Sequence, residues 1–104
     1  MAQWEHIAGR DELAEGGRKS VVVDETPALL LHVGGAYYCI EDVCTHDGQP
    51  LTDGPVAEGQ ITCPRHGARF DLRTGAATCM PATEPVRTFE VRVRDDGVFA
   101  RTGD

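Results

Sequence analysis

This sequence has few basic residues and no long apolar run, and each shortage argues against a class of protein. Ten Lys and Arg stand against 17 Asp and Glu, a formal net charge of -7, whereas nucleic-acid binding needs a basic surface for the phosphates. No apolar run is longer than the one at 27–31, and a membrane-spanning helix needs roughly 20 such residues. The N-terminus lacks a basic stretch followed by an apolar one, so we expect no signal peptide, no membrane anchor and a cytoplasmic protein.

Length and cysteine content narrow the class further. A chain of 104 residues is long enough for one compact core and too short for two ordinary domains, so we expect a single domain over residues 1–104, and a monomer. Cytoplasmic thiols stay reduced, which makes the four cysteines metal ligands or free thiols rather than disulfides. The cysteine usage therefore points to a metal.

Short β-favouring runs separated by Gly, Pro and Asp dominate the sequence, and no segment keeps a helical period for three turns. This pattern predicts an all-β fold, with one helical turn at 11–15. Gly34-Gly35 and Asp96-Gly97 each predict a two-residue hairpin loop, because glycine adopts the positive φ that such loops require. The expected strands cover residues 4–8, 20–23, 28–33, 36–40, 60–63, 68–72, 86–94 and 98–101.

Two groups of apolar residues are candidates for the core. The first group lies on the expected buried face of the long C-terminal strand, and consists of Val86, Phe89, Val91 and Val93. The second group is aromatic, and consists of Trp4, Tyr37, Tyr38 and Phe70.

Two short segments in the middle of the chain each combine one Cys with one His. Cys44 and His46 are spaced Cys-x-His, Cys63 and His66 are spaced Cys-x-x-His, and sixteen residues separate the two pairs. Two thiolates and two imidazoles from two loops can enclose a metal centre. An iron–sulfur cluster and a structural zinc site are both open at this point, although such zinc sites usually pair Cys with Cys and His with His.

The paired motif and its surroundings resemble the Rieske ferredoxin family, in particular the ferredoxin components of ring-hydroxylating oxygenase systems. The resemblance runs from the expected strand at Trp4 to Ala100. It implies an antiparallel β-sandwich with a small cluster-binding subdomain, at about 42–82, formed by two loops. Beyond the four ligands, the residues that match the family pattern are Gly48, Leu51, Gly54, Pro64, Gly67, Phe70, Asp71, Thr74, Gly75 and Pro81.

The same resemblance implies a ligand set and a role. Cys44 and Cys63 are expected to hold one iron of a [2Fe-2S] cluster, and His46 and His66 the other. The implied function is transfer of one electron at a time from a flavin-dependent ferredoxin reductase to a terminal oxygenase. Service to another redox system, such as one linked to iron–sulfur assembly, stays open as the alternative.

The chain is not expected to be an oxygenase itself. Catalysis by a Rieske oxygenase requires a separate mononuclear iron held by two His and a carboxylate. Only His6 and His32 are left outside the motif, and neither has ligand-like neighbours. We therefore expect surface or core roles for both.

Three positions bear on the reduction potential. Respiratory Rieske proteins have a disulfide between the two loops and a serine hydroxyl near the cluster, and this chain has Gln49, Arg65 and Ala68 at those places. A potential near the low end of the family's range, roughly -150 to +300 mV, is therefore expected.

Residues next to the motif have further expected roles. Gly48 and Gly67 let backbone N–H groups approach the cluster sulfurs. Met80 and Pro81 resemble a loop that covers one side of the cluster.

The remaining cysteines and acidic residues have plainer interpretations. Cys39 is expected to be a small buried hydrophobe, and Cys79 a free thiol beside the loops. The acidic residues Glu41, Asp42 and Asp47 are interpreted as part of a solvated loop, with recognition of a partner protein as the alternative.

Overall fold

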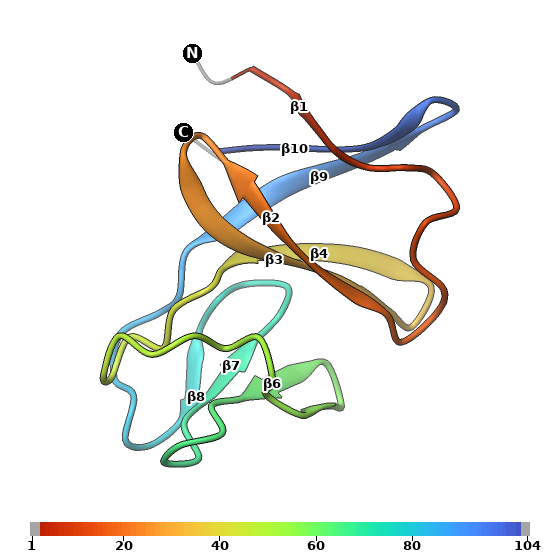
Figure 1. Ribbon diagram of the computed structural model, residues 1–104. Coiled ribbons are helices and arrows are strands. Elements are labelled where there is room, and N and C mark those ends of the chain that lie inside the picture. The colour runs from red at the N-terminus through yellow and green to blue at the C-terminus, as the bar shows by residue number, and fades with distance from the viewer. Residues whose placement is uncertain (1–2, 103–104) are drawn as a thin grey trace.

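The computed structural model describes residues 3–102, which form ten β-strands in two antiparallel sheets and contain no helix (Figure 1). The expected all-β fold is confirmed. The larger sheet has the order β1-β10-β9-β4-β3-β2, with strands Glu5–Ala8 (β1), Arg18–Val23 (β2), Thr26–Val33 (β3), Ala36–Glu41 (β4), Thr88–Arg94 (β9) and Gly97–Thr102 (β10). The smaller sheet contains Val56–Ala57 (β5), Gln60–Thr62 (β6), Arg69–Asp71 (β7) and Ala77–Cys79 (β8).

The larger sheet curls until its two edge strands approach each other. Lys19 in β2 donates from Nζ to the carbonyl of Ile7 in β1 at 3.0 Å. The backbone N–H of Asp24, just after β2, donates to the Glu5 carboxylate in β1 at 2.7 Å. The upper layer in Figure 1 is therefore a nearly closed barrel, and the smaller sheet lies below it.

Tight turns fix the register of the hairpins. Gly34 and Gly35 join β3 to β4 with φ values of 63° and 79°, as expected. Asp24 and Glu25 make an equivalent turn between β2 and β3, with φ values of 50° and 62°, which the sequence did not indicate.

The expected Asp96-Gly97 loop is wrong by one residue. Gly97 pairs with Arg94, so the loop consists of Asp95 and Asp96, and Gly97 opens β10 with a φ of 147°. Glycine is required there for another reason, because a Cβ at this position would collide with the ring of His6.

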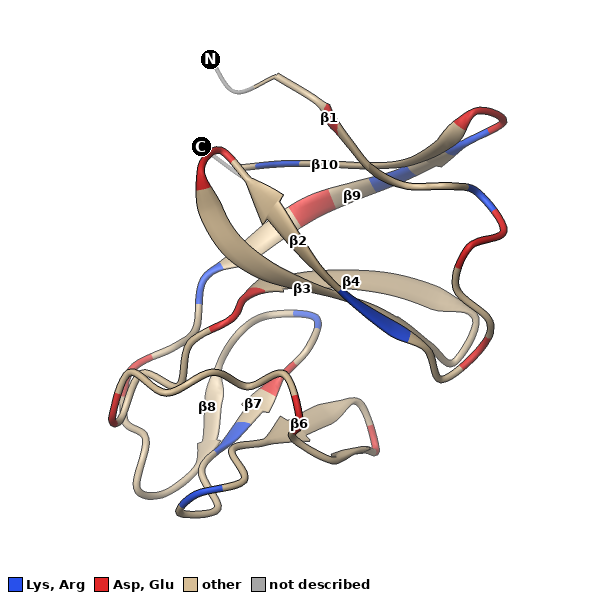
Figure 2. Ribbon diagram, in the orientation of Figure 1, with Lys and Arg blue, Asp and Glu red and all other residues tan. Residues whose placement is uncertain are grey.

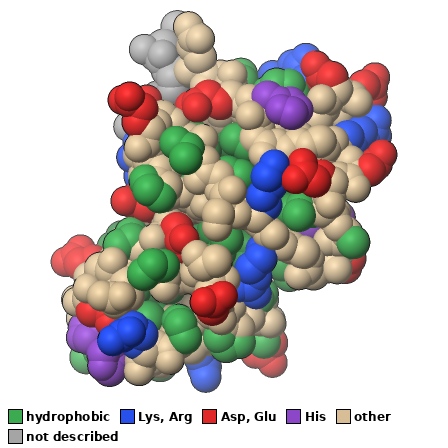
Figure 3. Space-filling view, viewed as in Figure 1, with side chains coloured by type: hydrophobic (Ala, Val, Ile, Leu, Met, Phe, Trp, Pro, Cys, Tyr) green, Lys and Arg blue, Asp and Glu red, His purple; other side chains and the backbone are tan. Residues whose placement is uncertain are grey.

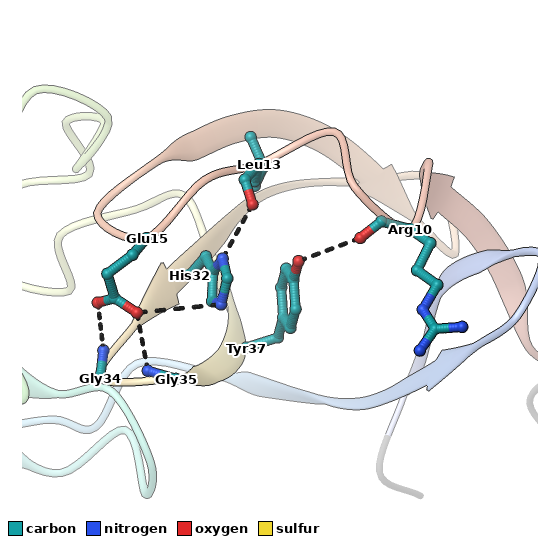
Figure 4. A network of polar contacts seen from close by, with 7 residues as sticks. All are labelled: Arg10, Leu13, Glu15, His32, Gly34, Gly35 and Tyr37. Atoms are coloured by element: carbon teal, nitrogen blue, oxygen red, sulfur yellow. Dashed lines mark hydrogen bonds and ion pairs between the residues drawn. The ribbon is translucent and has the colours of Figure 1, made fainter.

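The helical turn expected at 11–15 is also wrong, and polar contacts with the β3–β4 hairpin explain why (Figure 4). The carbonyl of Leu13 bonds Nδ1 of His32 at 2.9 Å instead of a helical N–H group. The Glu15 carboxylate accepts the backbone N–H groups of Gly34 at 2.6 Å and Gly35 at 2.8 Å. The segment is thereby held over the hairpin in an irregular conformation.

Two hydrophobic cores lie on opposite faces of β3. Leu29 and Leu31 point into the core between the two sheets, together with Phe70 and Leu72 of the smaller sheet. Leu30 points into the interior of the curled sheet. Because β3 is covered on both faces, its sequence is continuously apolar from Ala28 to Leu31.

Some expected core residues are not buried. In the C-terminal strand Val86 and Phe89 are buried and Val91 is half-buried, but Val93 is 45% exposed. β9 pairs with β4 only through Thr88 and Phe89, so its later residues extend past the core.

The four aromatic candidates differ in burial in the same way. Phe70 is fully buried, whereas Tyr37 and Tyr38 are half-buried. Trp4 lies against the guanidinium carbons of Arg92 and Arg101, each 4.4 Å from its ring, and is also only half-buried.

Candidate metal centre

Two loops beside the smaller sheet carry the four predicted ligands, and they share one backbone pattern. The first loop follows β4, and there the N–H of Cys44 donates to the Gln49 carbonyl at 2.7 Å, while the Cys44 carbonyl accepts the N–H of Gly48 at 2.7 Å. The second loop joins β6 to β7. Its Cys63 makes the same two bonds, to the Ala68 carbonyl at 2.7 Å and from the Gly67 N–H at 3.1 Å. Each cysteine therefore begins a tight turn that a glycine closes.

Those glycines supply the backbone conformation that closes each turn. Gly48 and Gly67 have φ values of 76° and 82°, in the left-handed region that side chains disfavour. Their own N–H groups donate to the cysteine carbonyls. The backbone N–H groups that point at the Cys44 sulfur belong to His46 and Asp47.

The two thiols lie together in the interior. Cys44 is 0% and Cys63 1% exposed, and both belong to the core cluster between the two sheets. Burial raises the pKa of the Cys44 thiol, the backbone N–H of His46 lowers it, and the neighbouring Cys63 raises it again. Two thiolates at this place would repel each other unless a cation lay between them, which suits a metal.

The two imidazoles lie on the outside of the same site. The rings of His46 and His66 have centroids 5.3 Å apart and an interplanar angle of 81°, and both residues are exposed. Figure 3 shows histidine side chains at the surface of the lower left end of the molecule, beside basic and acidic groups. The site therefore has sulfur donors inside and nitrogen donors at the surface.

Asp47 connects the two loops, a role that the sequence did not indicate. Its carboxylate lies 3.4 Å from Nδ1 of His66, and it also accepts the backbone N–H of Gln49 at 3.0 Å. That Gln49 bond is the main cause of the lowered pKa of Asp47. Among the described residues, the Asp47 carboxylate lies within 4.8 Å of donor atoms of Cys44 and His46. Its position beside two ligands in the motif was the signal available for this role.

The other cysteines lie outside the site, as expected. Cys39 is 2% exposed, and burial raises its pKa to about 12, so the thiol stays protonated. Cys79 is exposed on β8, and all four cysteines are free of disulfides.

The two histidines outside the motif have structural contacts instead of metal-site contacts. His6 packs edge-on against Phe99 at 5.2 Å, and His32 stacks on Tyr37 at 4.2 Å. The surface and core roles expected for both are confirmed.

Comparison with known proteins decides between the open alternatives. The Rieske [2Fe-2S] domain family matches residues 3–90. The chain belongs to this family. As a Rieske protein it carries one [2Fe-2S] cluster, and the zinc site is set aside.

Relatives of this Rieske protein include ferredoxin subunits of dioxygenases. The anthranilate 1,2-dioxygenase ferredoxin subunit of Burkholderia cepacia is 33% identical over 103 residues, covering 99% of this chain and 95% of that protein. The ferredoxin of carbazole 1,9a-dioxygenase from Nocardioides aromaticivorans IC177 has a TM-score of 0.86 and 32% identity, covering 98% of this chain and 99% of that one.

A third similar chain comes from a complex of reduced oxygenase and oxidised ferredoxin in carbazole 1,9a-dioxygenase. Its TM-score is 0.85 and its identity is 32%, and the match covers 93% of this chain and 91% of that one. The Rieske fold expected from the sequence is thereby confirmed over almost the full length.

Departures from the respiratory Rieske pattern are visible at the surface of the loops. Gln49 and Arg65 are both exposed, and no disulfide joins the two loops. Met80 is 71% exposed in a segment that the hydroxyl of Thr45 ties to the first loop by a 2.7 Å bond to the Glu84 carbonyl. A shielding role for Met80 stays a prediction.

Proposed function

We propose that this chain is a Rieske-type ferredoxin that delivers single electrons to a terminal oxygenase. The convergence of two buried thiols and two exposed imidazoles on matching loops carries this proposal. Its relatives are ferredoxin subunits of dioxygenases, and one similar ferredoxin forms a complex with its oxygenase. The chain acts as an electron carrier and is not itself an enzyme. A flavin-dependent reductase as electron donor and a cytoplasmic location belong to the same proposal.

We assign the ligands by their depth. Cys44 and Cys63 would hold one iron of the cluster, and His46 and His66 would hold the other. The burial of the thiols and the exposure of the imidazoles support this division. When bound, the cluster supplies a one-electron couple, whose potential two neutral imidazoles raise relative to an all-cysteine cluster.

The surrounding residues have separate tasks. The backbone N–H groups of His46 and Asp47 point at the Cys44 sulfur and offset its negative charge. The exposed imidazoles offer a partner the shortest approach to the centre. Figure 2 shows charges of both signs on the loops at this end, which suits a polar docking surface. Residues 1–104 are taken as one domain, with 42–82 as its cluster-binding part.

Electron transfer is tested with the purified protein and a terminal oxygenase of a ring-hydroxylating dioxygenase system. We expect a coloured protein that takes up one electron per chain and returns to its oxidised spectrum when the oxidised oxygenase is added. Cys79→Ser should behave like the wild type, whereas Cys44→Ser should lose both the colour and the transfer. A colourless protein with bound zinc, or a reduced protein that the oxygenase does not reoxidise, would refute the proposal.

A further inference from the structure

The segment 49–54, which follows the first pair of predicted ligands, is held from two sides, by a residue of the large sheet and by the residue that directly follows its strand β4. Arg18 in β2 donates from Nη1 to the carbonyls of Thr52 at 2.8 Å and Gly54 at 2.7 Å. Asp42, directly after β4, accepts the N–H of Leu51 at 2.7 Å and the hydroxyl of Thr52 at 2.5 Å. Figure 1 shows this segment passing beneath the large sheet. The acidic residue that the sequence assigned to a solvated loop is therefore committed to internal bonds.

This segment leads directly to the first buried cysteine. The carbonyl of Gln49 accepts the N–H of Cys44 at 2.7 Å. Leu51 is 0% exposed and belongs to the same core cluster as Cys44 and Cys63. A shift of the segment would therefore move the backbone of Cys44 and alter the packing around its sulfur.

The same segment also contacts the second ligand loop. A Cβ on Gly54 would collide with the carbonyl of Thr62, so the two backbones touch. The N–H of Thr62 donates to the Pro55 carbonyl at 2.9 Å, and Thr62 directly precedes Cys63. The carbonyl that Arg18 holds thus lies against the strand that delivers the second cysteine.

We propose that Arg18 and Asp42 are positioning residues that set the reduction potential by fixing both ligand loops against the large sheet. The inference rests on the proposed function, since it concerns the cluster held by those loops. Backbone N–H groups aimed at a cysteine sulfur favour the reduced state, because they offset the added negative charge. A loosened segment lets the Cys44 turn relax, weakens those bonds and lowers the potential.

If Arg18 and Asp42 acted only through their charges, the reduction potentials of their variants would change in a different pattern. Loss of a nearby cation disfavours the reduced state, and loss of a nearby anion favours it. Arg18→Met and Asp42→Ala should then move the potential in opposite directions. Positioning instead predicts that both lower it, and that the uncharged change Thr52→Val, which removes one bond to Asp42, lowers it too.

The experiment compares these three variants with two matched controls. Lys19→Met removes a neighbouring cation of β2 whose bonds go to the Ile7 carbonyl and the Glu12 carboxylate in the large sheet. Glu41→Gln removes the charge adjacent to Asp42. For each protein with an intact two-iron spectrum, the potential is measured by redox titration, and amide hydrogen exchange is measured over 49–54.

We expect each of the three variants to shift the equilibrium with a reference dye at least threefold toward the oxidised protein. That shift is about 28 mV, given about 59 mV per tenfold change for one electron. Amide hydrogen exchange over 49–54 should become faster in the three variants. The reduction potentials of both controls should differ from that of the wild type by less than half of that shift of about 28 mV.

Opposite shifts for Arg18→Met and Asp42→Ala, or a Thr52→Val protein with the wild-type potential, would overturn the inference. Should the charged variants fail to fold, Thr52→Val decides alone. A wild-type protein without the two-iron spectrum would instead refute the proposed function.

Discussion

At the scale of single residues, the two ligand loops depend on backbone conformations that glycine adopts without strain. Gly48 and Gly67 close the turns that begin at Cys44 and Cys63, at φ values of 76° and 82°. Gly75 has a φ of 80° as well, but it also lies against the Val86 carbonyl, where a Cβ would collide. The cost of a side chain should therefore differ among these positions.

Gly48→Ala should lower the free energy of unfolding by about 1–2 kcal/mol, the cost of a left-handed conformation for an L-residue. Apart from Gly48 and its two chain neighbours, no residue has an atom within 4 Å of the added Cβ, so we expect no steric cost in addition. Gly75→Ala should cost more, because the backbone at Val86 must also move. Denaturant unfolding of both variants measures the order, and equal costs would contradict the structure.

The sequence names the four ligands by residue number because their spacing is local, and their ligation of the cluster stays a prediction. It did not predict the bonds of Arg18, which join a strand to a carbonyl 34 residues away. It named Gly48 and Gly67 as the positions that let backbone N–H groups approach the sulfurs, but it did not say which N–H groups these are. Spacing identifies which residues a turn needs, but not where each N–H points.

At the scale of elements, the sequence predicted eight strands and one of the tight turns well. It missed β5 and β8, which have two and three residues, too few for an alternating pattern. It missed the turn at Asp24 and Glu25 because that signal relied on glycine, whereas strand pairing on both sides imposes positive φ there. The sequence predicted one helical turn at 11–15, but this segment instead makes polar contacts with the β3–β4 hairpin.

Those contacts make the β3–β4 hairpin sensitive to acid. The N–H groups of Gly35 and Gly34 lower the pKa of Glu15 below its ordinary value of 4.5. A carboxyl with a lowered pKa in the folded state stabilises the fold at pH values above its unfolded pKa. This contribution is lost as the pH falls from 4.5 through the lower folded value.

Glu15→Gln should therefore have a lower Tm than the wild type near neutral pH, and the difference should shrink in acid. Thermal unfolding followed across this pH range measures it. Asp53→Asn is the control, because Asp53 is exposed and has no side-chain partner in the part of the chain described. A Tm difference that does not change with pH would contradict the role of the Glu15 charge.

At the scale of the whole molecule, β3 separates two cores, and only one of them contains Cys44 and Cys63. Leu29 and Leu30 are both 0% exposed, but Leu29 packs with Cys44 and Cys63, whereas Leu30 packs inside the curled sheet. The alternation of a strand explains this division. Substitutions at Leu29 and Leu30 can therefore separate an effect on the stability of the fold from an effect on retention of the cluster.

Leu29→Ala and Leu30→Ala should each cost roughly 2–5 kcal/mol of stability. Only Leu29→Ala should also speed the loss of visible colour in the presence of an iron chelator, since only it leaves a cavity beside the sulfurs. Colour loss at equal rates in the two variants would contradict the separation of the cores.

The reduction potential should lie near the low end of the Rieske range, roughly -150 to +300 mV. The two loops lack a disulfide, and Ala68 supplies no hydroxyl at the position expected for a serine. A redox titration measures it, and a value above about +100 mV, in the upper part of that range, would be inconsistent with this assignment.

Histidine ligation is the central claim, and pulsed electron paramagnetic resonance of the reduced protein, grown with ¹⁵N-histidine, tests it most directly. Two imidazole nitrogens should couple to the cluster spin, and His66→Ala should lose one of them, if the cluster survives. His6→Ala and His32→Ala should leave both couplings unchanged. A reduced wild-type protein without any ¹⁵N coupling would contradict the account.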